Sequence, residues 1–512
     1  MKMFRFLIAL AASAAALTAE DLSAESVNRE KSPNTRPAAA ARPQDKSPEE
    51  LTQIMEEYAS RPDAYSEAYR PQFHFSPMTG WMNDPNGLVY YDGEYHLYFQ
   101  AWPQDVRAGG KIWSHAVSPD LVHWKQIEHA LLNEGPRQIF SGSAVIDHNN
   151  TAGFQTGDEK TLVAVYTLTN PSVQCIAYSN DRGRTFTKIK EPVVETINAN
   201  NRDPRVFWHE PTRKWVMILY LAKPSAFALM GSNDLKEWTN LSDVTIPGGN
   251  ECPESFELAV DGDKTNTRWV AWSASGIHRI GQFDGVTFTP DAPDPLPSEW
   301  GSCCYAGQTW NDTPDGRRIF IGWMRSKAGR QIAADVYEGM PFTQQMTVPR
   351  ELSLRSTDDG PRLFAMPVKE LDTLRREGRR WSNLALKAGM NPLSEIAGDL
   401  FDIEMEVEIG AAQSLTLDIS GTPIVYDAAA RQLSCLGKSV EAPPIAGRLK
   451  LRVLVDRTSI EIFINEGRYV MSFCFRPDAA NRRFSLTASG GDARIHSLHV
   501  WPLSSIWMQK GS

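Results

Sequence analysis

Apolar and polar residues alternate most regularly in the last third of the chain. In FDIEMEVEI, residues 401–409, every second residue is apolar, and LKLRVLVD and SIEIFINEG alternate in a similar way. Such alternation is typical of a β-strand that buries one face and exposes the other. Because it recurs between residues 381 and 507, it predicts a C-terminal β-sandwich. The charged stretch before it, residues 366–380, is predicted to be a connector.

Between residues 70 and 365, aromatic and β-branched segments follow a repeating plan. NDPNGLVYYDGEYHLYF, from Asn83, and RDPRVFWHEPTRKWVMI, from Arg202, each pass from polar-Asp-Pro into an apolar strand, a polar turn and a second apolar strand. Three further segments fit this plan. The anchor positions of the five units are Asp84, Gly142, Asp203, Glu251 and Ala306.

A second marker runs out of phase with these anchors. Ser-x-Asp followed by an aromatic residue begins at residues 118, 179 and 232, with a spacing similar to that of the anchors. Five such units, each with room for about four strands, predict a β-propeller. The expected fold is therefore all-β, with a five-bladed β-propeller over residues 70–365 followed by the sandwich.

The first residues have the plan of a secretory signal peptide. Lys2 and Arg5 precede an apolar run, and small residues end near Ala19. The apolar run is short for a membrane span, so a membrane anchor is the less favoured alternative. Residues 20–69 are predicted to be a disordered linker in which LTQIMEEYAS, residues 51–60, could form a short helix. We expect a secreted or periplasmic protein with no membrane span once residues 1–19 are cleaved.

Composition narrows the class of protein. A chain of 512 residues with 42% hydrophobic and 22% charged residues is typical of a soluble globular protein. The net charge of −9 argues against a nucleic-acid partner. Six Cys in so long a chain do not form a disulfide scaffold. Fifteen Trp are many, and such rings serve both in sugar-binding loops and in cores.

The predicted propeller brings distant carboxylates together. Equivalent positions of the blades surround one axis, so Asp84, Asp203 and Glu251 are expected at a common funnel. Paired carboxylates in a cleft suit glycoside hydrolysis, in which one protonates the leaving oxygen and another attacks or activates water. Asp84 lies in WMNDPNG, residues 81–87, whose Asn, Pro and Gly predict a turn.

The local surroundings of these carboxylates predict different roles. Amides beside Asp84 and the guanidinium of Arg202 beside Asp203 should favour the ionised aspartates, whereas Glu251 has few stabilising neighbours and should show a raised pKa. Asp84 is therefore expected to be the nucleophile and Glu251 the general acid/base. Asp203 is expected to stabilise the sugar through hydrogen bonds.

Several motifs, in this order along the chain, resemble those of glycoside hydrolase family 32, the invertase, levanase and inulinase group of β-fructosidases: WMNDPNG, HAVSPDLVHW, FSGSA, RDP, ECP, VPREL and LVDRTSIEIFINEGR. The resemblance extends from about Arg70 to Leu503. It implies a five-bladed propeller with a sandwich, and a retaining mechanism that uses no metal or other cofactor. Retention implies two working carboxyl groups about 5–5.5 Å apart.

The resemblance also implies roles for individual residues. Asp84 would attack the anomeric carbon of a fructosyl unit, Glu251 would protonate the leaving group and later activate water, and Asp203 would hold fructose hydroxyls. The positions that match sugar contacts of the family are Trp81, Asn83, Gln100, Phe140, Ser141, Arg202 and Trp323.

Three stretches depart from the family pattern, and they concern the walls around the carboxylates. QAWP, residues 100–103, stands where Gln-Tyr-Asn-Pro is common, and RAGG, residues 107–110, lacks a Trp that often faces the sugar. CCYA, residues 303–306, stands where Asp-Phe-Tyr-Ala is frequent. Trp102 either replaces the missing stacking surface or only packs. These departures bear on substrate preference more than on catalysis.

The sequence thus predicts an exported retaining β-fructosidase that acts on terminal fructosyl bonds of levan or inulin, and on sucrose. Three alternatives remain open. A fructosyltransferase of the same family would pass the fructosyl unit to a sugar instead of water. A propeller enzyme acting on arabinans or xylans is disfavoured by the motif set. A non-catalytic carbohydrate-binding propeller would not need all three carboxylates.

Overall fold

The computed structural model describes residues 45–507, apart from 199, 224, 327–335 and 479. The predicted signal peptide and the first part of the predicted linker lie outside the described residues. The described part of the linker contains the helix α1 (Pro48–Ser60). Its start is fixed by a capping box, because Ser47 Oγ accepts from the Glu50 backbone N–H at 3.2 Å and Glu50 accepts from the Ser47 N–H at 2.8 Å.

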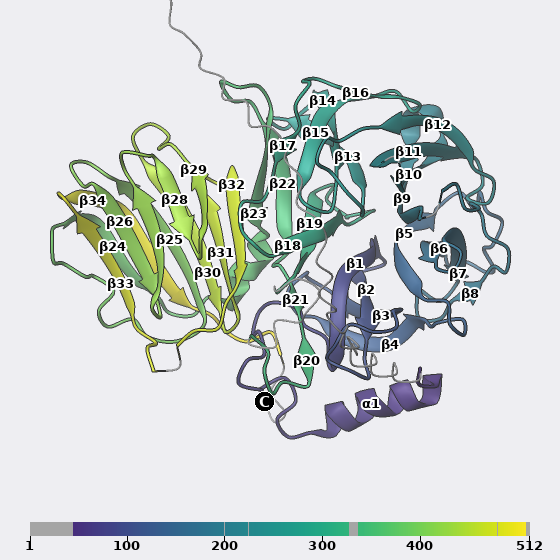
Figure 1. Ribbon diagram of the computed structural model, residues 1–512, viewed down its shortest axis with the longest axis horizontal. Coiled ribbons are helices and arrows are strands. Elements are labelled where there is room, and N and C mark those ends of the chain that lie inside the picture. The colour runs from purple at the N-terminus through teal and green to yellow at the C-terminus, as the bar shows by residue number, and fades with distance from the viewer. Residues whose placement is uncertain (1–44, 199, 224, 327–335, 479, 508–512) are drawn as a thin grey trace, which may run out of the picture. The chain divides into compact units, whose positions relative to one another are not determined.

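Five blades are arranged around a common centre, which confirms the predicted propeller (Figure 1). In each of the first three blades, strands that follow one another in the sequence pair antiparallel. Their strands are β1 (Gly80–Tyr91), β2 (Glu94–Trp102), β3 (Ile112–Ser118) and β4 (Lys125–Leu131); β5 (Ile139–Asp147), β6 (Thr161–Leu168), β7 (Val173–Ser179) and β8 (Thr187–Lys188); and β9 (Arg202–His209), β10 (Lys214–Ala222), β11 (Ser225–Ser232) and β12 (Thr239–Val244).

Blades four and five share one continuous sheet, because β13 and β22 pair through Val260 and Leu354. In blade three, a short 3₁₀ turn, η1 (Glu210–Thr212), joins β9 to β10. Blade four contains β13 (Glu254–Val260), β14 (Asp263–Trp272), β15 (Ile277–Phe283), β16 (Phe288–Pro290) and β17 (Leu296–Pro297). Blade five contains β18 (Cys304–Thr309), β19 (Arg318–Met324), β21 (Gln345–Met346), β22 (Arg350–Arg355) and β23 (Arg362–Pro367), while β20 (Phe342–Thr343) pairs with β1 of blade one.

The innermost strands of the blades are β1, β5, β9, β13 and β18. Neighbouring inner strands contact one another, as β1 does with β5 and β18, and β5 with β9. Between β9 and β13, a buried ion pair joins Arg205 Nε to Glu254 Oε1 at 2.7 Å. Each of these strands starts near the end of the propeller axis where Asp84 and Asp203 lie, and it runs towards the opposite end of the axis.

The second sequence marker is one turn repeated in three blades. It follows the third strand, where an Asp side chain accepts from two later backbone N–H groups. Asp120 accepts from residues 122 and 123, and Asp234 accepts from residues 236 and 237. Asp181 accepts from residues 184 and 185. Each of these turns needs an Asp at its start whose side chain accepts from the backbone ahead. The marker therefore recurs once in each of these blades.

The C-terminal sandwich packs a six-stranded sheet on a five-stranded sheet, as its alternating pattern predicted. A 3₁₀ segment, η2 (Lys369–Leu374), precedes it. One sheet contains β24 (Arg379–Leu386), β25 (Phe401–Glu408), β30 (Leu449–Asp456), β31 (Ser459–Ile464), β32 (Tyr469–Cys474) and β34 (Ala493–Pro502). The other contains β26 (Ser414–Ile419), β27 (Thr422–Asp427), β28 (Gln432–Cys435), β29 (Lys438–Glu441) and β33 (Phe484–Ser489).

A buried charge network joins the sandwich to blade five and to the segment before β1. Glu461 of β31 accepts from Arg350 and, at 2.8 Å, from His74, whose other ring nitrogen lies 2.8 Å from Asp456. Burial lowers the pKa of His74, but its bonds to Asp456 and Glu461 outweigh burial and raise that pKa to about 9. Burial likewise opposes ionisation of Glu461, yet Arg350 and His74 bring its pKa down to about 2.

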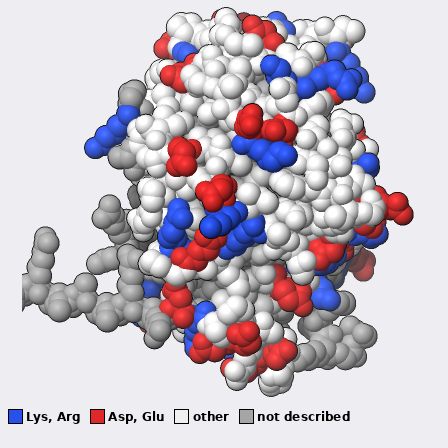
Figure 2. Space-filling model, turned by 90° about the vertical axis from the view of Figure 1, so that its right-hand side faces the viewer, with Lys and Arg blue, Asp and Glu red and all other residues white. Residues whose placement is uncertain are grey.

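The surface gives two further facts. On the face in Figure 2, the Lys and Arg side chains of the described residues lie among Asp and Glu side chains rather than in one large basic patch. Within residues 45–507 as described, no helix is both long and apolar enough to cross a membrane.

Candidate active site

The propeller brings the three predicted carboxylates to one end of its axis. Asp84 lies on β1, Asp203 on β9, and Glu251 directly precedes Cys252 in the segment before β13. The Cys252 backbone N–H donates to Asp203 Oδ2 at 3.1 Å. Cys252 Sγ lies 3.5 Å from the same oxygen and 3.6 Å from Asp84 Oδ2. The three acids, which are far apart in sequence, are therefore neighbours in space.

The segment WMNDPNG is not a turn, so this prediction is wrong. Residues 81–87 lie within β1 and pair with β2, with irregularities in register between Met82 and Pro85 and between Asn86 and Val89. Bulges of this kind accommodate residues that suit turns and re-aim the side chains between them. Gly87 has φ +55° and lies against Tyr98, where an added Cβ would come within 2.6 Å of the ring.

Asp84 is held by donors to both of its oxygens. Ser141 Oγ donates to Oδ2 at 2.6 Å and Asn83 Nδ2 donates to Oδ1 at 2.8 Å. Only 8% of Asp84 is exposed. Burial raises its pKa, and the negative charge of Glu251 adds to that rise, while Lys111, Ser141 and Asn83 oppose it.

Asp203 is held in a conformation that few residues other than glycine adopt. Its φ is +62°, and its backbone N–H donates to Thr167 Oγ1 at 2.9 Å. Non-glycine residues with such backbone angles cluster at functional sites, where surrounding contacts maintain the strain. Burial raises the pKa of Asp203 to about 7; Arg202 opposes the rise and the charges of Glu251 and Asp84 add to it.

Glu251 receives hydrogen bonds from two different blades. Tyr305 Oη, from β18, donates to Oε1 at 2.6 Å, and Arg202 Nη2, from β9, donates to Oε2 at 2.7 Å. Its side chain remains 30% exposed. Burial works to raise its pKa, but the bonds from Tyr305 and Arg202 outweigh burial and leave the pKa lowered.

The predicted order of ionisation is therefore reversed. The sequence predicted ionised aspartates and a raised pKa for Glu251, whereas burial raises the pKa of both Asp84 and Asp203 and the pKa of Glu251 is lowered. Burial outweighs the amide and guanidinium neighbours of the two aspartates. Tyr305, a principal stabiliser of ionised Glu251, comes from a distant part of the sequence, and nothing in the residues next to Glu251 indicated its contribution.

The seven predicted sugar-contact residues all lie around these carboxylates. Asn83 and Ser141 bond to Asp84, and Arg202 bonds to Glu251, as described above. The others form a wall that is partly aromatic: Trp81 lies edge-on to Trp323 with ring centroids 6.2 Å apart, and Gln100 and Phe140 share a contact with Lys111. Trp323 Nε1 donates to Gln344 Oε1 at 3.1 Å, which fixes its ring.

Trp102 does not belong to this wall. It is 5% exposed and lies on the backbone of Gly109 and Gly110, where a Cβ on Gly109 would fall 2.2 Å from Trp102 Nε1. The RAGG stretch therefore provides room for a packed indole. Of the two interpretations of Trp102, packing is the one observed.

Sequence reasoning missed four residues of the site: Lys111, Cys252, Tyr305 and Arg325. Lys111 Nζ donates to Gln100 Oε1 at 3.0 Å and lies 4.6 Å from the centroid of Phe140 and 5.5 Å from that of Trp81. Arg325 lies over the ring of Tyr305, with its guanidinium carbon 4.1 Å from the centroid. A signal was present, because Lys111 directly follows RAGG and Tyr305 lies within CCYA, two of the three departures from the family pattern.

The site offers carboxylates for acid–base and nucleophilic chemistry. In the described part of the chain, no group of three or more His, Cys, Asp or Glu side chains is arranged to hold a metal ion. Three carboxylates gathered at one end of the propeller axis suit glycoside hydrolysis, in which carboxyl groups serve as acid, base and nucleophile. Fold and site together define a glycoside hydrolase.

The chain belongs to glycosyl hydrolases family 32. The model of the family's N-terminal domain matches residues 74–367, and that of its C-terminal domain matches residues 370–502. The chain is 38% identical to a levanase of Bacillus subtilis (strain 168) over 504 residues, which cover 89% of this chain and 74% of that protein. It is 30% identical to an extracellular exo-inulinase of Aspergillus awamori over 521 residues, 86% of this chain and 96% of that one.

Solved structures show the same architecture. The crystal structure of exo-inulinase from Aspergillus awamori matches with a TM-score of 0.78 at 29% identity, over 86% of this chain and 100% of that one. A fructofuranosidase from Schwanniomyces occidentalis complexed with fructosylnystose matches with a TM-score of 0.76 at 26% identity, over 86% of this chain and 99% of that one. The protein is thus a glycosidase of the fructan- and sucrose-degrading β-fructofuranosidase family.

Proposed function

We propose that the protein is an exported β-fructosidase that hydrolyses terminal fructosyl bonds of levan or inulin, and of sucrose, with retention of configuration. The observation that carries the proposal is the convergence of Asp84, Asp203 and Glu251 around Cys252 at one end of the propeller axis. The names of the levanase and exo-inulinase relatives support a fructan substrate. The extracellular relatives and the predicted signal peptide over residues 1–19 support export.

Asp84 is the nucleophile in this proposal. Its oxygens are oriented by Ser141 and Asn83, so one of them can attack the anomeric carbon of the terminal fructosyl unit. As the new carbon–oxygen bond forms, the glycosidic bond breaks and Glu251 gives its proton to the leaving oxygen. Glu251 then takes a proton from water, which attacks the same carbon and releases Asp84 and free fructose.

Glu251 has to be protonated before it acts as the acid. Hydrogen bonds from Tyr305 and Arg202 lower the pKa of Glu251, whereas burial raises that of Asp203 to about 7. A fructosyl unit over Glu251 excludes water, which raises the pKa of Glu251, and sugar hydroxyls that donate to Asp203 favour its ionised form. Substrate binding therefore favours the protonated form of Glu251 and the ionised form of Asp203.

Lys111 contributes a positive charge close to the sugar wall. Its ammonium group shares contacts with Gln100, Phe140 and Trp81, and it favours the ionised forms of Asp84 and Glu251. An ionised Asp84 is required for nucleophilic attack. We assign Lys111 the role of a positioning residue that offsets the burial of Asp84.

The alternatives differ in what accepts the fructosyl unit. A fructosyltransferase would use the same carboxylates and form longer sugars, and a non-catalytic binding propeller would bind sugar without releasing fructose. An arabinan- or xylan-acting enzyme would turn over neither levan nor inulin. Each alternative therefore predicts a different set of products.

Product analysis tests the proposal. The purified protein is incubated separately with sucrose, inulin and levan, and the sugars are separated by chromatography at successive times. We expect free fructose from the start, without early short oligomers. Early oligomers would mean endo action and elongated sugars would mean transfer. No turnover of any of the three would overturn the β-fructosidase proposal.

A further inference from the structure

A large cavity lies at the end of the propeller axis remote from the carboxylates. The inner strands connect the two ends: β9 runs from Asp203 at the carboxylates to Trp208 at the cavity, and β1 runs from Asp84 to Val89, which bridges to Asn311 in the cavity wall. Five residues of strand span about 16 Å. The cavity is therefore separate from the site described above.

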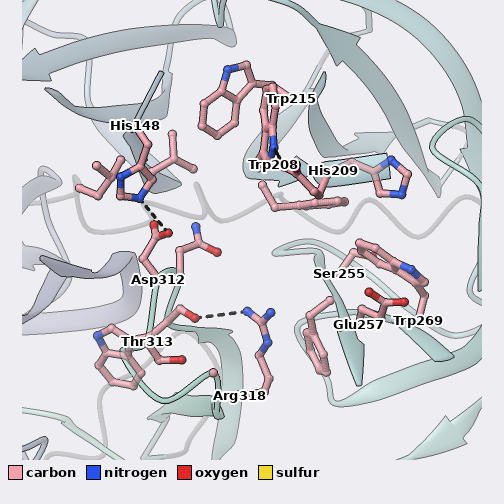
Figure 3. A pocket seen from close by; sticks show the side chains of 18 of the residues that line it. His148, Trp208, His209, Trp215, Ser255, Glu257, Trp269, Asp312, Thr313 and Arg318 are labelled. Carbon is pink, nitrogen blue, oxygen red and sulfur yellow. Dashed lines mark hydrogen bonds and ion pairs between the residues drawn. The ribbon is translucent and has the colours of Figure 1, made fainter. Parts of the chain in front are cut away.

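The cavity has a volume of about 430 Å³, which lies in the range of small-molecule sites, about 300–1,000 Å³. Its wall includes half-buried and exposed residues such as Trp208, Glu210 and Glu257, so it is open to solvent. Figure 3 shows the side chains around an open centre, with His148 and Asp312 on one side and Trp269 and Glu257 on the other.

Aromatic rings form one part of this wall. Trp208 packs edge-on against Trp215, with ring centroids 5.0 Å apart, and its Nε1 donates to Glu210 Oε2 at 2.5 Å. Trp269, which packs on Phe207 and Phe283, is 93% buried, so it supports the wall more than it lines it. Trp208 is held in one orientation and leaves part of its indole accessible, which is what a sugar ring needs in order to pack its C–H groups against a flat surface.

Polar groups with unused hydrogen-bonding capacity form the other part. Arg318 Nη1 donates to Trp310 O at 3.2 Å, but its buried Nε has no partner among the described residues. Arg318 as a whole is only partly buried and lines the cavity, so the rest of its guanidinium can donate to a ligand oxygen. Opposite, His148 Nε2 lies 3.3 Å from Asp312 Oδ1.

The charges of the wall disfavour an anion. Glu210, Glu257 and Asp312 all line the cavity. The other lining guanidinium, that of Arg317, is already paired with Asp315, Glu351 and Glu370. Glu210, Glu257 and Asp312 already contact Trp208, Thr267 and His148, but each carboxylate has further lone pairs that a purely apolar ligand would leave unused. A neutral polyhydroxylated ligand can donate to the carboxylates, accept from Arg318 and pack against Trp208.

We propose that this cavity is a second carbohydrate-binding site, which takes a neutral sugar unit of the fructan substrate away from the catalytic carboxylates. Only the identity of the sugar rests on the proposed function, because the wall itself indicates a neutral carbohydrate. A polymer held at this end of the axis stays on the enzyme between successive cleavages. Because the polymer stays bound at the cavity, the concentration of its chain ends near the catalytic carboxylates is raised.

The proposal is tested by fluorine NMR of protein labelled with 5-fluorotryptophan. The protein carries Asp84→Asn to prevent turnover, and the Trp208 resonance is assigned by its loss in Trp208→Phe. Sucrose and the trisaccharide 1-kestose are then titrated. We expect a saturable shift of the Trp208 resonance and no shift of that of Trp381, a partly exposed tryptophan on β24.

A second variant keeps the test independent of the tryptophan. Glu257→Gln removes a charge from an exposed position of the wall, and Glu441→Gln removes one from an exposed position of β29. We expect Glu257→Gln to weaken the Kd seen at Trp208 at least threefold and Glu441→Gln to leave it unchanged. A Trp208 resonance that does not move with either sugar, or that moves only with inorganic phosphate, would overturn the proposal. Because binding is read without turnover, failure of the β-fructosidase assay is a separate result.

Discussion

Arg202 Nη2 donates to Glu251 Oε2 at 2.7 Å, while Nε of the same guanidinium lies 3.5 Å from Asp203 Oδ2. One cation thus lies between two carboxylates whose pKa values are shifted in opposite directions. It acts with Tyr305 to lower the pKa of Glu251, whereas burial keeps that of Asp203 near 7. The ionised form is therefore favoured at Glu251 and disfavoured at Asp203.

Tyr305→Phe tests the hydrogen bond that favours ionised Glu251. Without the donor at 2.6 Å, the pKa of Glu251 rises, so the protonated acid persists to higher pH. We expect the alkaline limb of the kcat/KM profile for sucrose to move up by about 0.5–1 pH unit. Tyr91→Phe, which removes a similar bond to Glu159, is the control and should leave the limb in place. A limb that stays in place or moves down in Tyr305→Phe would contradict this account of Glu251.

Lys111→Met tests the positive charge that acts on Asp84. Lys111 opposes the rise in the pKa of Asp84, so its loss raises that pKa and shifts the acid limb of kcat/KM to higher pH. We expect about a tenfold loss at acidic pH and a smaller loss near neutrality.

Lys111→Arg keeps the charge and is the matched control for this test. Its acid limb should remain near that of the wild type. An equal loss at every pH in Lys111→Met would mean that Lys111 acts on the sugar rather than on Asp84.

Asp203→Asn tests the raised pKa through stability. The pKa of Asp203 is about 7 when folded, above its unfolded value, so the folded state binds more protons between about pH 4 and pH 7. Wild-type stability therefore falls as pH rises through that window. Asn avoids this loss, and it tolerates the left-handed backbone at this position.

We expect the Tm of Asp203→Asn to exceed that of the wild type by about 2 °C at pH 8 and to equal it near pH 4. Thermal unfolding at the two pH values measures this difference. The exposed Asp294→Asn should change Tm equally at both. A Tm of Asp203→Asn below that of the wild type at pH 8 would refute the inference that ionised Asp203 destabilises the folded protein.

His74→Gln tests the charge network that joins the sandwich to the propeller. The pKa of His74 rises to about 9 on folding, so its stabilisation is complete below about pH 6.5 and is lost as pH rises through 9. Because the change leaves Asp456 and Glu461 short of a buried partner, we expect a loss of about 3 kcal/mol in the free energy of unfolding at pH 6.

The loss in His74→Gln should shrink towards pH 10, which urea unfolding at the two pH values measures. His496→Gln, which removes a more exposed pair with Glu408, is the control and should cost less than about 1 kcal/mol. A loss in His74→Gln that does not depend on pH would show that His74 acts by packing alone.

The architecture could be predicted from the sequence because each blade repeats the same local chemistry. Asp120, Asp181 and Asp234 each accept two backbone bonds in an equivalent turn, so the marker and the period follow from one physical requirement. The sandwich followed from strict alternation in β25. The failure at residues 81–87 has the opposite origin: residues that suit a turn were absorbed into β1 by pairing with β2 and by bulges.

The carboxylates could be located from the repeat, but their ionisation could not. The pKa of Asp84 and Asp203 depends on burial, and that of Glu251 on Tyr305 and Arg202 from other blades. Lys111 lies at the site because the RAGG stretch that precedes it packs over Trp102. Contacts between segments far apart in sequence decide these properties, and local neighbours do not report them.

The central claim is that Asp84 attacks the fructosyl unit, and the most direct test is the kcat of Asp84→Asn with sucrose and levan beside that of the wild type. The account predicts a loss of about 10⁴-fold or more on both substrates, with the variant folded as judged by its Tm. An Asp84→Asn protein that releases fructose within tenfold of the wild-type rate would show that Asp84 is not the nucleophile.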